Sequence, residues 1–280
     1  MSDFALSIDG ASCRVWPDGP NWDGAPAAAI GKLEFGSAEA GAALLNQACE
    51  QLRGVGRNRV LAPMDGDTWH AYRAVTQSDG SPPFALEPRS GPHDVAALRT
   101  AGFETVTDYV SARAPVPQPG GRAPDVPGVA VQAWDGQGAD ALLDRLFALA
   151  GGSFADKLFF KPIERDDFLA LYRPMLAAID PRLVLFAFDP HGDLAGFLFG
   201  LPDWAQGATP DTAILKTYAS RRGGAGHLLA HEFHGRARDL GYTHVIHALM
   251  HVDNVSLERS AMHGGTIFRR YSLFGRREAA

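Results

Sequence analysis

The 280-residue sequence has few cysteines, no long apolar run and no excess of positive charge. Its two cysteines, Cys13 and Cys49, are too few for a disulfide framework, and neither belongs to a Cys-x-x-Cys pair of the kind that binds zinc. The longest apolar runs, residues 183–188 and 194–201, are far shorter than the ~20 residues of a membrane-spanning helix. We therefore expect neither a disulfide scaffold nor a membrane partner.

The charge balance argues against a nucleic-acid-binding protein. Twenty-six lysines and arginines stand against 32 aspartates and glutamates, so the net charge of −6 offers no attractive field to a phosphate backbone. The first four residues, MSDF, lack the charged-then-apolar form of a signal peptide. We expect a cytoplasmic protein with no nucleic-acid partner, and no feature of the sequence indicates an oligomeric state.

A proline-rich stretch divides the sequence into two parts. Residues 112–129 contain five prolines and three glycines without an apolar period, which is typical of a linker. The total length also corresponds to about two domains of ~150 residues each. We predict an N-terminal domain over residues 1–112, a linker over residues 113–127 and a C-terminal domain over residues 128–280.

The hydrophobic pattern of the C-terminal part predicts a mixed sheet with helices on its faces, an α+β fold. Pro174 is expected to kink the second of its helices. The predicted strands cover residues 128–134, 182–188, 193–201, 212–219, 243–251 and 266–274, and the predicted helices cover residues 139–150, 164–179, 225–240 and 254–263.

The most informative segment joins the strand predicted at residues 212–219 directly to the helix predicted at residues 225–240. Glycines at positions 223, 224 and 226 leave the backbone accessible, so successive amides at the helix start can point at one anion. The helix N-terminus and the side chains of Arg221 and Arg222 favour a phosphate there. The segment lacks the Gly-Lys-Ser/Thr end of a P-loop and the third glycine of a dinucleotide-binding turn, which excludes both.

Residues 221–226 have the form R-x-x-G-x-G and resemble the coenzyme A pyrophosphate loop of the GNAT superfamily of N-acetyltransferases. The surroundings are similar as well, because a helix and a strand follow the loop and Asn254 then starts a short helix. The resemblance covers about residues 128–276 and implies a GNAT-type acyltransferase fold. Residues 93–103 resemble the end of a second, degenerate GNAT-like copy, which lacks the loop motif and is expected to bind no coenzyme. An unrelated α+β domain is the alternative for this N-terminal part.

The resemblance implies acetyl-CoA as the cosubstrate. In the family, a backbone amide of the splayed fourth strand contacts the thioester carbonyl, and the glycine loop binds the pyrophosphate. Carried over to this sequence, the coenzyme-binding residues are Thr217, Tyr218, Ala219, Arg221, Arg222, Gly223, Gly224, Ala225, Gly226, His227 and Asn254.

The general acid departs from the family pattern. The tyrosine that commonly protonates the leaving thiolate is replaced by Ala261. Tyr271, Ser260 and His263 are the alternatives, and Tyr271 is the first choice. The other interpretation of Tyr271 is an aromatic residue packed in a strand.

Candidates for the general base are Asp211, at the start of the fourth strand, and His247 or His251 in the fifth, since imidazole titrates near neutral pH. The alternative is that these candidate bases are ordinary polar residues at strand ends.

His227 and His231 share a helix face at i,i+4 spacing, but no third metal ligand is fixed nearby. We therefore expect no metal.

The acceptor pocket of such folds is built largely by the two helices after the first strand. Their connection, residues 151–162, has paired glycines and three phenylalanines, which suits a mobile apolar lid carrying Phe159 and Phe160. Burial of these two rings against the sheet is the alternative. Tyr172 and Trp204 are expected to add aromatic walls.

Two long loops of the N-terminal part, residues 63–73 and 82–88, either face the C-terminal cleft or seal the interface between the domains.

The function we favour is acetyl-CoA-dependent transfer of an acetyl group to a small-molecule or peptide amine. A CoA-binding sensor without turnover is the main alternative, favoured by the missing tyrosine. An aminoacyl transferase using charged transfer RNA is the third, and the acidic balance argues against it.

Overall fold

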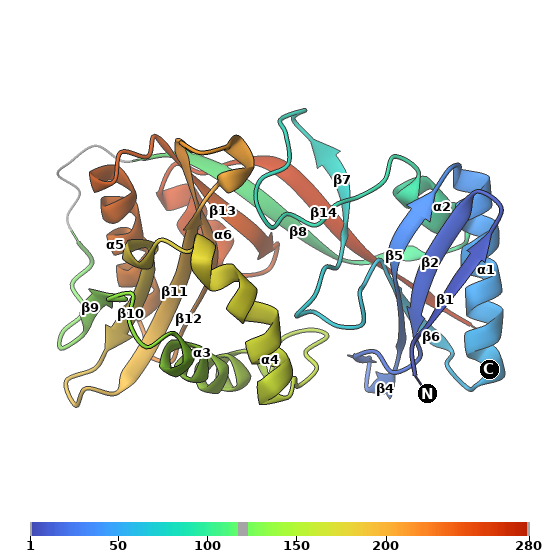
Figure 1. Cartoon of the computed structure of the whole chain (residues 1–280), viewed down its shortest axis with the longest axis horizontal. Helices are drawn as coiled ribbons and strands as arrows, with labels where there is room; N and C mark the ends of the chain where they lie inside the picture. The colour runs from blue at the N-terminus through green and yellow to red at the C-terminus, as the bar shows by residue number, and fades with distance from the viewer. Residues whose placement is uncertain (1, 117–122, 279–280) are drawn as a thin grey trace.

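One large mixed sheet runs through the computed structural model, which describes residues 2–116 and 123–278 (Figure 1). Its strand order is β1-β2-β5-β6-β14-β8-β13-β12-β11-β10-β9, with β7 pairing to β14. The N-terminal part contributes β1 (Phe4–Ile8), β2 (Ala11–Trp16), β5 (Ala28–Phe35), β6 (Arg59–Ala62), β7 (Ala74–Ser78), β8 (Glu104–Pro115), a small hairpin of β3 (Asn21–Trp22) and β4 (Ala25–Pro26), and helices α1 (Ala38–Gly54) and α2 (Asp94–Thr100).

The C-terminal part confirms the predicted order of helices and strands. Its strands are β9 (Ala130–Ala133), β10 (Val184–Phe188), β11 (Leu194–Pro202), β12 (Thr212–Ser220), β13 (His244–His251) and β14 (Thr266–Arg277). Its helices are α3 (Ala139–Phe154), α4 (Arg165–Tyr172), α5 (Ala225–Asp239) and α6 (Val255–Met262). At Pro174, which cannot donate a backbone hydrogen bond, α4 gives way to a 3-10 helix over Arg173–Ala178.

Two long strands tie the halves together. β8, from the N-terminal part, lies between β13 and β14, and β14, from the C-terminal part, pairs with β6 and β7. Figure 1 shows both strands crossing the middle of the molecule side by side. The division into domains stays a prediction, since β8 includes residues 113–115 of the predicted linker and residues 117–122 lie outside the described part.

Apolar side chains cover both faces of the C-terminal half of the sheet. Helices α3 and α4 pack on one face through a cluster that includes Leu143 and Phe168. Helix α5 packs on the opposite face through Leu229 and Phe233, the latter with no exposed surface. This sandwich fixes the start of α5 against the end of β12, where the candidate site lies.

Each half contains one parallel strand–helix–strand unit. In the N-terminal half, β5 and β6 are parallel and α1 connects them; in the C-terminal half, β12 and β13 are parallel and α5 connects them. The first paired residues, Ala28 with Val60 and Thr212 with His244, therefore align the two units position by position. This alignment allows equivalent sites in the two halves to be compared.

Candidate active site

β12 and β13 separate within the sheet. They pair in parallel only from Thr212 to Leu215, and β12 then continues to Ser220 without β13 as a neighbour. Both strands are irregular at the separation: the register of β12 shifts around Lys216, and that of β13 shifts around Leu249, whose φ is +57°. The result is an opening between the strands, with main-chain groups at its edges.

The glycine loop lies at the end of the opening that faces α5. Gly224 caps the helix with φ +81° and has no side chain that could satisfy the first amides. Within the described residues, the backbone amides of Gly223, Gly224 and Gly226 have no hydrogen-bond acceptor. A Cβ on Gly226 would lie 2.8 Å from Nη1 of Arg259, so the glycine allows the guanidinium to lie directly against the helix start.

The two predicted phosphate-binding arginines make contacts with carbonyl oxygens. Arg221 donates from Nη2 to the oxygen of Ala148 at 3.2 Å, and Arg222 donates from Nη2 to the oxygen of Pro127 at 3.1 Å. Both side chains are exposed, and single hydrogen bonds of this kind are readily exchanged for contacts with a phosphate. In the described part of the chain, the amides of Gly223, Gly224 and Gly226 are thus neither capped internally nor paired with an acidic side chain.

A third guanidinium, which the sequence analysis missed, stands beside the loop. Arg259 projects from α6, is half-buried and donates from Nη1 to the hydroxyl of Tyr218 at 3.3 Å. Its place one turn after Asn254, the first residue before α6, is the sequence signal that could have identified it. Arg259 adds positive charge where the loop amides already favour an anion.

Most of the remaining coenzyme candidates cluster around the same point. Thr217, Tyr218 and Ala219 form the end of β12 that pairs with β11 but no longer with β13. His227 lies in the first turn of α5 with its ring 6.2 Å from that of His263. Asn254 is exposed and makes no side-chain cap at the start of α6. The structure therefore brings Thr217, Tyr218, Ala219 and the loop together at the start of α5, whereas no contact in the described residues joins Asn254 to them.

Tyr271, the candidate general acid, is fully buried. Its hydroxyl donates to the carboxylate of Glu87 and lies 3.1 Å from Oγ of Ser111. Burial and the charge of Glu87 raise the pKa of Tyr271 far above its ordinary value, and burial also raises the pKa of Glu87. A tyrosine with such a high pKa, already bonded to a carboxylate, is a weak proton donor.

His247, a candidate base, belongs to a buried histidine cluster between α5, β13 and α6. Its Nε2 lies 3.0 Å from Nε2 of His234, and its Nδ1 lies 2.6 Å from Oγ of Ser260. His234 uses Nδ1 to donate to the oxygen of Ala230 at 2.7 Å, so its Nε2 accepts and His247 donates. Burial and the neighbouring His234 and His263 lower the pKa of His247 to about 3.

The other two base candidates are bonded elsewhere. Asp211 accepts hydrogen bonds from Gln206 at 3.0 Å and Thr212 at 2.8 Å, and these bonds lower the pKa of its carboxyl. It precedes Thr217 by six residues, roughly 20 Å along an extended strand. His251 has Nε2 2.6 Å from Oγ1 of Thr107.

An apolar cavity lies under α3 and α4 and reaches β12 at Thr217. Phe160 contacts Trp69 edge-to-face with ring centroids 5.9 Å apart, while Phe159 is buried and packs elsewhere, among Tyr109, Tyr271 and Leu249. Trp204 packs against the apolar cluster around the cavity. The cavity lining includes Leu142, Leu146, Phe154, Phe168, Tyr172, Phe197, Phe199 and, from the N-terminal loop at residues 63–73, Trp69.

Trp69 was not predicted as a site residue, and its position shows that this N-terminal loop does reach the C-terminal half. Its Nε1 donates to the oxygen of Lys161 at 2.8 Å, and its ring meets that of Phe168 edge-to-face at 5.7 Å. The loop over residues 82–88 also crosses over, since the amide of Ala85 donates to Asp203 at 2.8 Å.

The equivalent opening in the N-terminal half is filled. The carboxylate of Asp65 accepts from the backbone amide of Lys32 at 2.9 Å and pairs with its Nζ at 2.7 Å. Ser37 caps α1 by accepting from the amide of Ala40 at 3.1 Å, and Glu39 places a negative charge in the first helical turn. This arrangement disfavours an anion at α1.

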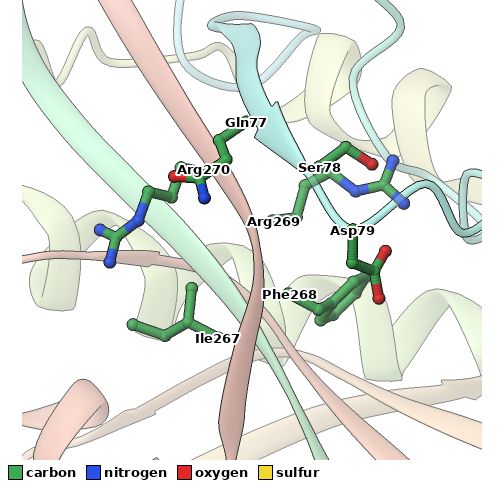
Figure 2. A pocket seen from close by; sticks show the side chains of 7 residues that line it. All are labelled: Gln77, Ser78, Asp79, Ile267, Phe268, Arg269 and Arg270. Atoms are coloured by element: carbon green, nitrogen blue, oxygen red, sulfur yellow. The ribbon is translucent and has the colours of Figure 1, made fainter.

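A second hollow lies apart from the loop, where the register between β7 and β14 shifts after Arg270. Figure 2 shows Arg269 together with Ser78 and Asp79 on one side of β14, and Arg270 and Ile267 on the other. Arg269 is buried and pairs with Glu87 at 3.2 Å. The hollow therefore borders the buried polar seam formed by Glu87, Ser111 and Tyr271.

Among residues 2–116 and 123–278, no group of three or more histidine, cysteine, aspartate or glutamate side chains is placed to hold a metal ion. None of the helices in that part of the chain is both long and apolar enough to cross a membrane.

Comparison with solved structures identifies the class of fold. The chain has the fold of the GCN5-related N-acetyltransferases, as predicted. A GCN5-related N-acetyltransferase from Sphaerobacter thermophilus is 14% identical, with a TM-score of 0.59 over 97% of this chain and 78% of that one. No family model and no curated protein matches the sequence.

Two further solved structures cover nearly the whole chain. A tandem GNAT protein from the clavulanic acid biosynthesis pathway is 17% identical, with a TM-score of 0.56 over 96% of this chain and 79% of that one. A conserved protein from Enterococcus faecalis, described as a probable N-acyltransferase, is 11% identical, with a TM-score of 0.58 over 98% and 62%. At these identities the likeness is one of fold.

Proposed function

We propose that the protein is an acetyl-CoA-dependent N-acetyltransferase whose coenzyme binds at the start of α5. The observation that carries this proposal is the set of unpaired amides at Gly223, Gly224 and Gly226, placed beside the opening between β12 and β13. Three arginines surround these amides, and a pyrophosphate would satisfy both the amides and the positive charge.

The proposed reaction is direct transfer. A neutral amine attacks the thioester carbonyl, whose oxygen develops negative charge and is stabilised by a backbone amide at the end of β12. The tetrahedral intermediate then collapses, the C–S bond breaks, and the thiolate of CoA and the amide product leave. The amine loses one proton and the thiolate gains one. Water is the proposed carrier of these protons, because Tyr271 and His247 are buried and strongly shifted in pKa.

Calorimetric titration with acetyl-CoA tests the binding site. Gly224→Glu places a carboxylate against the loop amides and is expected to abolish the binding signal of the wild type. Gly241→Glu is the matched control, because Gly241 lies just beyond the other end of α5, has φ +87° and has no atoms nearby that a Cβ would meet. Equal binding by both variants, or no binding by the wild type, would rule out the proposed site.

The second candidate function is a CoA sensor of the same fold without turnover. It is favoured by Ala261 at the position of the usual acid and by the buried environment of Tyr271. Release of free thiol from acetyl-CoA across a panel of amines separates the two candidates. An enzyme releases thiol in proportion to the amine, whereas a sensor binds the coenzyme and releases none.

A further inference from the structure

Two cationic side chains lie at the opening between β12 and β13, one on each edge and one from each half of the protein. Lys216 lies at the register shift of β12 and donates from Nζ to the oxygen of Leu86, in the N-terminal loop, at 3.3 Å. Arg73, which directly precedes β7, donates from Nη1 to the oxygen of Leu249 at 3.1 Å. The two edges of the opening are thus each bonded to the N-terminal half.

Arg73 is a buried charge without a counterion. Only 4% of the residue is exposed, and its guanidinium lies between the rings of Tyr72 and Tyr109, 3.8 and 3.7 Å from their centroids. Within the described residues, Nε of Arg73 has no hydrogen-bond partner and Arg73 forms no ion pair. Aromatic contacts offset part of the cost of burying this charge, but a guanidinium in such a place is best satisfied by an anion.

Lys216 is half-buried and, within the described residues, likewise forms no ion pair. Burial and the charge of Arg73 lower the pKa of its amine to about 7, against the opposing effect of Glu87. Glu87 is the carboxylate that acts on Lys216, and it is already bonded to Tyr271 and Arg269. Neither cation at the opening therefore has a free carboxylate from the described chain.

The apolar cavity is linked to this pair of cations through the chain. It reaches β12 at Thr217, the residue after Lys216, and its wall includes Trp69, four residues before Arg73. A ligand that reaches both would present a negative group to the cations and an apolar group to the rings of Phe168 and Tyr172.

From this arrangement we propose that the acceptor amine also carries a carboxylate, which Arg73 and Lys216 bind, and an apolar side chain, which enters the cavity under α3 and α4. An α-amino acid with a large apolar side chain has this chemistry. The planar fork of Arg73 suits a carboxylate, and a bound carboxylate would keep Lys216 protonated. That this ligand is the acetyl acceptor rests on the proposed function. Binding of its carboxylate, however, does not require turnover.

Matched amines test the inference. L-Phenylalanine and 2-phenylethylamine differ by the carboxylate alone, as do L-leucine and isoamylamine. With acetyl-CoA and the wild type, we expect thiol release with a kcat/KM about tenfold or more higher for the amino acid of each pair. Lys216→Met, which keeps the length of the side chain but removes its charge, should reduce this preference to near one.

The control is Lys32→Met, because Lys32 occupies the equivalent position in β5 and is paired with Asp65. It should keep the full preference for the amino acids. Arg73→Met should behave like Lys216→Met, with circular dichroism as the check on folding. Equal kcat/KM for the two members of each pair in the wild type, or a preference retained by folded Lys216→Met, would overturn the inference.

A binding measurement separates this inference from the proposed function. 3-Phenylpropanoate carries the carboxylate and the apolar group but no amine, and it should raise the Tm of the wild type and of Lys32→Met but not of Lys216→Met. If no amine releases thiol, the transferase proposal fails while this shift still supports the carboxylate site. If the wild type shows no shift, the carboxylate site is wrong even where thiol is released.

Discussion

Arg259 lies beside both the glycine loop and the opening between β12 and β13. Its guanidinium lies between Tyr218 of β12 and the first turn of α5, where a Cβ on Gly226 would approach it to 2.8 Å. A single cation at this point contributes to binding of a phosphate without taking part in the chemistry. This makes Arg259 a sensitive probe of where the coenzyme sits.

Replacing Arg259 by alanine should weaken acetyl-CoA binding by roughly tenfold or more, as expected for the loss of a charge-assisted hydrogen bond. Isothermal titration calorimetry measures the change in Kd. Arg238→Ala, at the far end of α5, removes an arginine whose one ion pair within the described residues is with its neighbour Asp239, and should leave Kd unchanged. An unchanged Kd in Arg259→Ala would place the pyrophosphate elsewhere.

Among the elements, α5, β13 and α6 are joined by the stacked histidines. The rings of His234 and His263 lie parallel with centroids 4.1 Å apart, and His247 bonds to His234 and Ser260. Burial lowers the pKa of His247 to about 3 and, together with the neighbouring histidines, that of His263 to about 4. These elements therefore hold together best when the cluster is neutral.

The cluster predicts a loss of stability in acid. An unfolded histidine binds a proton below pH about 6.5, whereas folded His247 does so only near pH 3, so the free energy of unfolding falls as the pH drops through this window. At pH 5, His247 alone should account for a loss of about 2 kcal/mol. Urea unfolding at pH 7.5 and pH 5 measures the loss.

His247→Gln keeps a hydrogen-bonding side chain but cannot titrate, so the difference in stability between the two pH values should shrink. His244→Gln, at the start of the same strand, is the control and should retain the full difference. The prediction is wrong if both variants lose stability in acid by the same amount.

At the scale of the whole molecule, the halves share strands rather than touching along a surface. β8 supplies the strand between β13 and β14, so the C-terminal half without it has two unpaired strand edges in the middle of its sheet. The seam formed by Glu87, Ser111 and Tyr271 crosses the same boundary. Each half therefore needs the other to complete its hydrogen bonding.

This dependence predicts the behaviour of separated halves. Co-expressed fragments of residues 1–119 and 120–280 should co-purify as one complex by size-exclusion chromatography and unfold in a single transition. Residues 120–280 expressed alone should aggregate, because β13 and β14 expose unpaired backbone groups. A folded, monomeric C-terminal fragment would show that the shared strands are dispensable.

Features that depend on neighbouring residues were predictable from the sequence. The glycine loop, the helix after it and the order of strands all follow from spacing within short windows, because helix periodicity and the conformational freedom of glycine are local properties. The acidic Glu39 at the start of α1, which disfavours an anion there, is also visible locally in the sequence.

The tertiary structure decided which distant side chains complete the site. Trp69, Arg73 and Glu87 belong to loops more than 120 residues before β12, and only the exchange of β8 and β14 brings them to the opening. The same exchange buries Tyr271, whose sequence position alone allowed either a general acid or a packed aromatic. Burial and charge at a site depend on every chain segment that surrounds it, and a local pattern specifies only one of those segments.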